Sequence, residues 1–265
     1  MCVNQDTEEN DSKTGFPIRS EYTTTAINLS AAIAEKNFKV LLVDLDPQGN
    51  STMGSGVEKN QIKSTIYDVL IGEKEIDNIL IFSENSKFFI APSNKNLAGA
   101  EVELVDLENR EYQLKNAIRR SKKVFDFIVI DCPPSLNLLT INALAFVNKV
   151  LIPMQCEYYA LEGLSDLVNT IKVVKQRMNS EIEIEGLIRT MFDSRNTLTN
   201  QVSDQLENHF AEKVYKAIIP RNVRLAEAPS HGLPAIFFDG VSKGASAYRE
   251  LAMEFLSRNK KVKEK

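Results

Sequence analysis

Hydrophobic residues follow two alternating spacings along most of this chain. Between Thr23 and Asn37 they recur every three or four positions, which predicts an amphipathic helix. The next segment, Lys39–Asp46 (KVLLVDLD), is an almost unbroken apolar run that closes on two acids. A short run of this kind predicts a strand that is buried on both faces.

The same alternation continues toward the C-terminal part of the chain. Further apolar runs predict strands at Lys87–Ala91, Phe125–Asp131, Lys149–Gln155, Ile184–Phe192 and Val214–Ile219. Helical spacing predicts helices between them, for example at Ser135–Phe146, Leu161–Met178 and Thr197–Phe210. Strands and helices that alternate at this distance are typical of βαβ units. The pattern therefore predicts an α/β fold with a doubly wound, mostly parallel sheet.

The first 22 residues do not share this regularity. Their few apolar side chains follow neither the period of a strand nor that of a helix. A doubly wound domain normally begins with a buried strand, and the sequence pattern predicts none before Thr23. We therefore divide the chain into an anomalous segment at 1–22, one α/β domain at 23–258 and a basic tail at 259–265.

The composition is that of an ordinary globular protein and excludes several classes. Of the 265 residues, 43% are hydrophobic and 26% are charged, and the formal net charge is −4. This balance argues against a disordered chain and against a wholly basic nucleic-acid coat protein, although a local basic patch remains compatible with it. No apolar run has the length that a membrane span needs, and the polar start does not predict a secretory signal. We expect a cytoplasmic protein whose three cysteines are reduced.

The first segment with recognisable chemistry is Val40–Ser51, VLLVDLDPQGNS. The predicted strand carries Asp44 and Asp46 to its carboxyl end, two residues apart and therefore on the same side of the chain. Ligands of open α/β sheets bind at this end of the strands. Two carboxylates there can hold Mg2+ through its water molecules or position an attacking water. The alternative is that they only end the strand and cap the turn at Pro47 and Gly49.

A second such segment is Phe127–Leu136, FIVIDCPPSL. Four apolar residues followed by Asp131 have the form of a Walker B strand, whose acid orients Mg2+ beside a nucleotide phosphate. The motif is weak alone, because many parallel strands end in Asp. It gains weight from the threonines at Thr23–Thr25, because hydroxyls and unpaired amides at a helix N-terminus can bind Mg2+ and phosphate. Ordinary helix capping is the alternative for these threonines.

Together with three later motifs, these segments resemble the ParA/Soj chromosome- and plasmid-partition ATPases of the ParA/MinD group. The motifs are, in the order of the family, KVLLVDLDPQGNST, FIVIDCPPSL, LIPMQCEYYALEGLS, TMFDSR and IIPRNVRLAEAPSHGLP. The similarity extends from Thr23 to about Leu256. It implies a P-loop NTPase fold and, as cofactors, ATP and Mg2+.

The resemblance implies roles for the residues at the predicted sheet edge. Asp46 matches the acid that positions the hydrolytic water, so it is the candidate catalytic residue. Asp44 and Asp131 match acids that support Mg2+. Thr23 matches the hydroxyl that ligates the metal and, with Thr24, belongs to the nucleotide site.

The resemblance also implies contacts with the base, with DNA and with protein partners. Pro220 and Asn222 match the segment that packs on and recognises adenine. Arg195 and Arg224 match positions by which these proteins hold DNA non-specifically, a role that suits the guanidinium fork. An ATP-dependent homodimer, a ParB-like partner and association with the nucleoid are implied as well. Membrane attachment is not expected, because the tail at 259–265 lacks the apolar face of an amphipathic helix.

Residues 17–22 depart from the family. A P-loop needs glycines, whose backbone amides wrap around the phosphates, and a lysine that neutralises their charge. The family form is KGGVGKTT, and the positions before Thr23–Thr24 read PIRSEY here, without lysine or glycine. Glu21 even adds a negative charge where phosphates bind. We therefore expect this chain to hydrolyse ATP poorly or not at all.

Three explanations are consistent with this departure, and the sequence does not decide among them. The gene is decayed or its start is misassigned; or the protein is a pseudoenzyme that keeps the fold and its DNA or partner binding; or a different phosphate cradle operates. The alternative function is accordingly a non-catalytic, DNA-associated regulator that modulates an intact homologue by forming mixed dimers.

Overall fold

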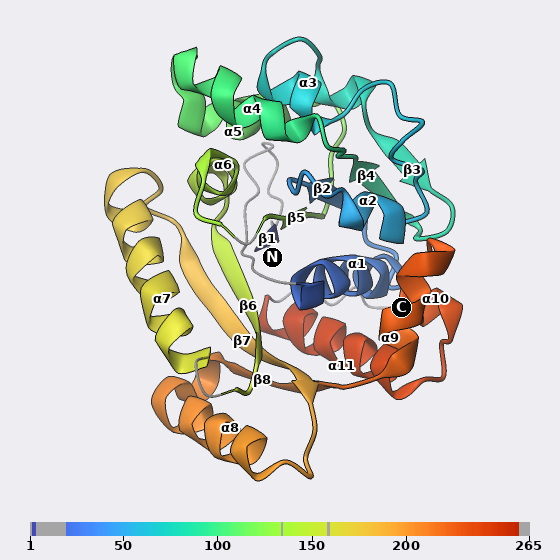
Figure 1. Ribbon diagram of the computed structural model, residues 1–265, viewed down its shortest axis with the longest axis vertical. Helices are drawn as coiled ribbons and strands as arrows, with labels where there is room; N and C mark the ends of the chain where they lie inside the picture. Colours follow the sequence, from blue (N-terminus) through green and yellow to red (C-terminus); the bar gives the residue numbers. More distant parts are fainter. Residues whose placement is uncertain (1, 4–19, 134, 158–159, 260–265) are drawn as a thin grey trace.

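The strands form two hydrogen-bonded groups of four in the computed structural model, which describes residues 2–3, 20–133, 135–157 and 160–259 (Figure 1). One group has the order β3-β4-β2-β5 and the other β1-β6-β7-β8. The strands are β1 Cys2–Val3, β2 Val40–Asp44, β3 Ile81–Ser83, β4 Phe88–Ala91, β5 Phe127–Asp131, β6 Lys149–Gln155, β7 Glu183–Phe192 and β8 Val214–Pro220. Pairing is parallel except for β1 with β6 and β3 with β4. The predicted mostly parallel sheet is confirmed.

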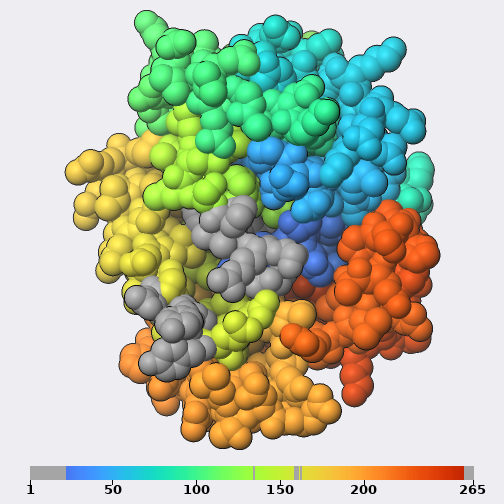
Figure 2. Space-filling model, in the orientation of Figure 1, coloured from blue at the N-terminus to red at the C-terminus, as the bar shows by residue number. Residues whose placement is uncertain are grey.

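Helices cover both faces of the sheet, as a doubly wound fold requires (Figure 1). They are α1 Ser20–Ala34, α2 Asn50–Gly54, α3 Ile66–Leu70, α4 Leu97–Glu103, α5 Gln113–Arg119, α6 Leu138–Phe146, α7 Ala160–Arg177, α8 Thr197–Phe210, α9 Val223–Glu227, α10 Ala235–Phe238 and α11 Lys243–Arg258. Short 3-10 turns lie at Ile76–Asn78, Leu104–Asp106, Arg110–Tyr112, Ala211–Lys213 and Ala228–His231. On the face seen in Figure 2, residues near 100–119 and near 195–210 form opposite ends of the surface.

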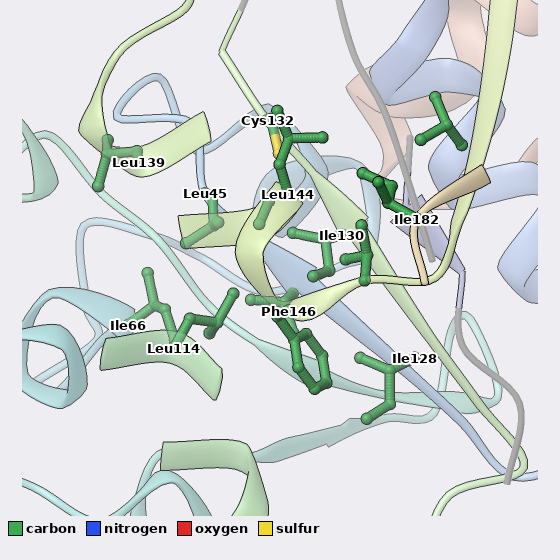
Figure 3. Packing of buried hydrophobic residues seen from close by; sticks show 14 of the residues in the cluster. Leu45, Ile66, Leu114, Ile128, Ile130, Cys132, Leu139, Leu144, Phe146 and Ile182 are labelled. Carbon is green, nitrogen blue, oxygen red and sulfur yellow. The ribbon is translucent and has the colours of Figure 1, made fainter. Parts of the chain in front are cut away.

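The position of β2 between two hydrophobic cores explains why its apolar run is unbroken. Leu41 and Val43 belong to one hydrophobic core, whereas Val40 and Leu42 belong to a second core that includes α1 and α11. Successive strand side chains point to opposite faces, so a strand between two helical layers needs apolar residues at every position. Figure 3 shows part of the first core, where side chains from β5, α5 and α6 gather around Phe146.

The predicted elements are found with differences at their ends. β4 to β8 and α6 to α8 lie where the apolar spacing predicted them, and β6 and α8 have the predicted bounds. The helix predicted from Thr23 begins three residues earlier, at Ser20, and ends at Ala34. β2 stops at Asp44 rather than Asp46, because the chain turns there: the Asp46 amide donates to Asp44 Oδ1 over 3.1 Å, and the Gly49 amide donates to the Asp46 carbonyl over 2.9 Å.

The structure has a first strand, β1, that consists of only two residues, Cys2 and Val3. The sequence pattern does not predict it. β1 pairs antiparallel with Lys149 and Val150 of β6 and contacts β5, so it lies between the two groups of strands (Figure 1). Residues 4–19, which include most of the segment 1–22, lie outside the described part of the chain. The division at 22 and at 258 remains a prediction, although α1 continues across residue 22.

Two of the cysteines lie in the hydrophobic core. Cys132 and Cys156 are each only 4% exposed, as expected of small core residues. In the part of the chain that the structure describes, no helix has both the length and the apolar character needed to cross a bilayer.

Arg249 joins three helices and gives a test of the packing. Its guanidinium donates to both Glu35 oxygens over 2.8 Å and also to the carbonyls of Ile236 and Gly240. We expect Arg249→Ala to lower the free energy of unfolding by about 1–3 kcal/mol, because a half-buried carboxylate and two carbonyls lose their donor. Urea denaturation at neutral pH measures this loss.

The matched control is Lys87→Ala, which removes an exposed ion pair with Glu84. Its expected effect is about 0–1 kcal/mol. Equal losses in the two variants would contradict a structural role for Arg249.

Candidate functional site

The predicted acids Asp44 and Asp131 meet at the carboxyl edge of the sheet. Each is the last residue of its strand, and the parallel pairing of β2 with β5 places them opposite each other. Both side chains are fully buried, and within the described residues neither carboxylate forms an ion pair. Two carboxylates at such a buried position repel each other, and the repulsion favours a proton or a cation there.

Asp44 holds the turn that follows β2. Its Oδ2 accepts hydrogen bonds from the Thr52 amide over 2.8 Å and the Thr52 hydroxyl over 2.7 Å, and its Oδ1 accepts from the Asp46 amide over 3.1 Å. The turn also needs Gly49, which has a left-handed conformation (φ 62°) and whose Cβ would lie 2.8 Å from the Ser93 carbonyl oxygen. Asp44 therefore holds the loop that follows β2 in place.

Asp131 gathers hydroxyl groups from two other elements. Its Oδ2 accepts from Thr23 of α1 over 2.7 Å and from Ser51 of α2 over 2.6 Å. Its Oδ1 is buried and has no hydrogen-bond partner among the described residues. The unpartnered carboxylate oxygen and the two hydroxyl groups together form a set of oxygen ligands of the kind that hard cations prefer.

Asp46 lies just past the strand end and is less buried than the other two acids. Its Oδ1 accepts from the Gln48 amide over 2.9 Å, and its carbonyl accepts from the Ser93 hydroxyl over 2.8 Å. The backbone is thus held on both sides while the carboxylate remains partly accessible, which suits contact with a water molecule or a ligand.

Burial and charge change how the acid pair titrates. Burial, and after it the charge of Asp131, raises the pKa of Asp44 to about 8, against the hydrogen bonds from Thr52. Burial also raises the pKa of Asp131, against the hydrogen bonds from Ser51 and Thr23. Carboxylic acids with raised pKa values at a strand end are candidates for a functional site.

We expect Asp131→Asn to raise the free energy of unfolding by about 1–3 kcal/mol at pH 8 and by less at pH 5. A carboxyl whose pKa is higher in the folded protein binds more protons there than in the unfolded chain, so stability falls as the pH rises between the two values. For Asp44 that window runs from 3.8 to about 8. Asparagine keeps an acceptor for Thr23 and Ser51 and removes the repulsion.

Urea denaturation at both pH values measures the effect, and Asp166→Asn on the exposed surface of α7 is the control for loss of one charge. If Asp131→Asn and the native protein lose stability equally between pH 5 and pH 8, the acid pair does not carry this dependence.

A pocket of about 330 Å3 lies beside α1. It brings together two of the residues predicted to bind nucleotide, Thr24 and Asn222, from distant parts of the sequence. Pro220 ends β8 two residues before Asn222 and is not among the lining residues. A small cavity with an apolar wall and a few polar groups is typical of a small-molecule site. The lining residues are Thr24, Gln155, Thr190, Met191, Ile219, Asn222, Leu225, Ala226, Pro229 and Tyr248.

The two predicted DNA-binding arginines lie after the carboxyl ends of β7 and β8, and each is paired with acids. Arg195 donates to both oxygens of Asp193, over 2.9 and 2.7 Å. These hydrogen bonds lower the pKa of Asp193 to about 2. Arg224 contacts Glu227 and Asp239.

The segment that replaces the phosphate loop is described only in part. α1 begins at Ser20, so the last three of the six loop positions, 20–22, are helical. Tyr22, at the position of the family's second lysine, is only 9% exposed. Positions 17–19 lie outside the described residues.

Sequence reasoning missed the hydroxyl groups that organise the acids: Ser51, Thr52 and Ser93. The Ser93 amide donates to the Thr52 hydroxyl over 2.9 Å, which links the end of β4 to the turn. The signal that was available is the small polar stretch Asn50–Thr52, which follows Asp46 after a three-residue turn, because hydroxyl residues there can reach back to a strand end.

Known proteins are similar to this chain over most of its length. A family model described as an AAA domain matches residues 20–184. The chain is 49% identical over 232 residues to the sporulation initiation inhibitor protein Soj of Bacillus subtilis, covering 88% of this chain and 92% of that protein. It is 48% identical over 237 residues to the chromosome partitioning protein ParA of Myxococcus xanthus, covering 89% and 84%.

Solved structures with the same fold include nucleotide-bound enzymes. Cobyrinic acid a,c-diamide synthase from Mycobacterium smegmatis with bound ADP and magnesium has a TM-score of 0.79 and 33% identity, covering 93% of this chain and 95% of that one. A plasmid partition protein from Borrelia burgdorferi has a TM-score of 0.72 and 25% identity, covering 92% and 98%.

Proposed function

Because the chain belongs to the ParA/Soj family of chromosome-partitioning ATPases, we propose that it is a partition protein that binds Mg2+ and adenine nucleotide and acts in chromosome or plasmid segregation. The observation that supports this most is the meeting of Thr23, Ser51 and Asp131, from three separate elements, at the carboxyl edge of the sheet. Bound ligands of open α/β folds lie at this edge.

The residues present fit a magnesium ion. Asp131 offers a buried carboxylate oxygen without a partner, and the Thr23 and Ser51 hydroxyls lie beside its other oxygen. No cluster of three or more His, Cys, Asp or Glu side chains with metal-site geometry occurs among the described residues. That agrees with Mg2+, which is usually held by one or two carboxylates, water and substrate phosphates. When bound, the ion would neutralise phosphate charge.

Asp46 is the candidate catalytic residue of this proposal. Its backbone is fixed by Ser93 and Gln48 while its carboxylate stays partly accessible. In that position it would orient a water molecule for in-line attack on a phosphate, the role that a water-positioning residue has in phosphoryl transfer. Asp44 accepts hydrogen bonds from the amides of Asp46 and Thr52. It would therefore act by positioning these two residues rather than by contacting the nucleotide or the metal ion itself.

The pocket beside α1 is the proposed site of the base. Thr24 and Asn222 line it, and the Asn222 side-chain oxygen accepts from the Arg224 amide, which fixes the side chain at the start of α9. Pro220 would contribute by shaping the β8–α9 connection.

DNA binding, dimer formation and a ParB-like partner belong to the same proposal. Arg195 and Arg224 are the candidate DNA contacts, and both lie after neighbouring strands at the carboxyl edge. An ATP-dependent homodimer would place this edge between two copies, and association with the nucleoid would follow from non-specific DNA binding.

A second candidate function is favoured by one observation. Tyr22 is buried where the family has a phosphate-binding lysine, so the charge that stabilises the transferred phosphate is missing. A protein of this kind would bind DNA and an intact homologue and would reduce the homologue's activity through mixed dimers, without ATP turnover of its own.

Titration of the purified 265-residue chain with a fluorescent ATP analogue, in Mg2+ and in EDTA, separates the two candidates. Saturable binding that requires Mg2+ and is lost in Asp131→Ala supports the partition ATPase. Absence of nucleotide binding together with retained binding of random-sequence duplex DNA supports the regulator. Absence of both, in a chain that is folded by circular dichroism, contradicts the proposed function.

A further inference from the structure

Arg224 is held between two carboxylates from different elements. Its Nη1 lies 2.8 Å from Glu227 Oε2 on the same helix, α9, and its Nε lies 3.0 Å from Asp239 Oδ2, just after α10. Half of the Arg224 side chain is exposed. One cation between two anions leaves the cluster with a net charge of −1, so as it stands this cluster repels a phosphate group.

Two further arginines follow the same strand ends: Arg195 follows β7 and Arg221 follows β8. The fork of Arg195 is occupied by Asp193. Arg221 is exposed, its amide donates to the Phe192 carbonyl over 3.2 Å, and its charge acts on Asp193. Among the described residues Arg221 forms no ion pair. Three arginines and three acids therefore share this surface, and their charges sum to zero.

We propose that Asp193, Glu227 and Asp239 restrain DNA binding at this surface, and that Asp239 is the residue that sets the restraint on Arg224. The partner is the phosphate backbone of duplex DNA, so the inference rests on the proposed DNA binding. Binding would exchange carboxylate for phosphate on each guanidinium. Such an exchange is feasible because exposed ion pairs contribute only about 0–1 kcal/mol each, but it lowers the affinity because the displaced acids remain nearby.

Asp239 is singled out because it belongs to a different element from Arg224. Glu227 lies on α9 with Arg224 and moves with it, whereas Asp239 follows α10, which contacts α9 (Figure 1). A shift of α10 relative to α9 would break only the Asp239 contact and change the cluster from −1 to neutral. The strength of DNA binding would then depend on the arrangement of these two short helices.

The test compares Asp239→Asn with the native chain in binding random-sequence duplex DNA over a range of salt concentrations. We expect the affinity to rise about 3- to 10-fold and the slope of log K against log salt to steepen by about one, because one more guanidinium can engage phosphate. Glu227→Gln is expected to act in the same direction. Thermal unfolding checks that each variant is folded.

Two further variants make the result specific. Glu84→Gln removes one negative charge from an exposed ion pair on the β3–β4 turn and should leave affinity and slope unchanged. Asp239→Asn combined with Arg224→Ala should lose the gain, because the restraint acts through Arg224.

Binding that depends on Arg224 but is unchanged by Asp239→Asn and Glu227→Gln would overturn this inference and leave the proposed function intact. A gain that persists in the Arg224→Ala background would also overturn it, because the effect would then be one of net charge. If neither the native chain nor Asp239→Asn binds DNA, the inference and the proposed DNA binding both fail.

Discussion

Replacement of residues 17–22 (PIRSEY) by KGGVGK is expected to strengthen the binding of an ATP analogue with Mg2+ by at least about 100-fold. The change supplies two lysines and three glycines directly before Thr23, whose hydroxyl the natural chain already brings to Asp131. Hydrogen bonds to charged groups contribute about 1.5–3 kcal/mol each, so two lysine contacts alone account for a factor of this size.

Titration with a fluorescent ATP analogue measures the change, and a loop of the same shape with glutamine in place of both lysines is the control. The control separates the contribution of charge from that of the glycine amides, which wrap the phosphates without any net charge. Equal affinity of the natural and restored chains would mean either that a different phosphate cradle operates or that the site cannot accept a nucleotide. The absolute affinity of the natural chain distinguishes these two cases.

Asp46→Ala in the loop-restored protein is expected to lower kcat for ATP hydrolysis by at least about 100-fold and to change nucleotide affinity by less than about 3-fold. A side chain that orients water or takes its proton contributes about 10^2- to 10^4-fold to rate, and its loss affects the transition state rather than ground-state binding. The fixed backbone of Asp46, held by Ser93, favours such a role.

Steady-state turnover and analogue titration give the two numbers, with Asp166→Ala on α7 as a control far along the chain. An unchanged kcat would remove Asp46 from the catalytic role. A large loss of affinity with unchanged kcat would instead place it among the residues that bind the nucleotide.

The sequence predicted the strands of the sheet well because burial on both faces leaves a clear mark. β6 and α8 have the predicted bounds, since an unbroken apolar run and a regular helical spacing have few other interpretations. The antiparallel edge strand β3 and the short helices α2 and α3 were not predicted, because three to five residues are too few to show a period. The start of α1 at Ser20 was also missed, since its first residues carry no helical apolar pattern.

The candidate site could be predicted only in part. The position of Asp131 beside the β2 strand end follows from parallel strands that end in acids, and the structure brings Asp44 opposite it. The different surroundings of the two acids do not follow from the sequence, because they depend on Thr52, eight residues away, whose amide and hydroxyl both donate to one Asp44 oxygen. The pairing of Arg224 with Asp239 depends on how α9 and α10 pack, which residue spacing alone does not reveal.

The arrangement of α1 has a consequence for how much damage the chain tolerates. Among the described residues, β1 pairs with β6 and contacts β5, while α1 packs against β2, β5 and β6 and so spans both groups of strands. Most of its buried side chains, among them Ala26, Leu29 and Ile33, lie beyond the altered positions 17–22. Cohesion between the two halves therefore comes from apolar contacts along the body of this helix, and phosphate chemistry would come from its first turn. The residues of the first turn can therefore change without loss of these apolar contacts. During evolution, ATP turnover can be lost in this way while the protein still folds.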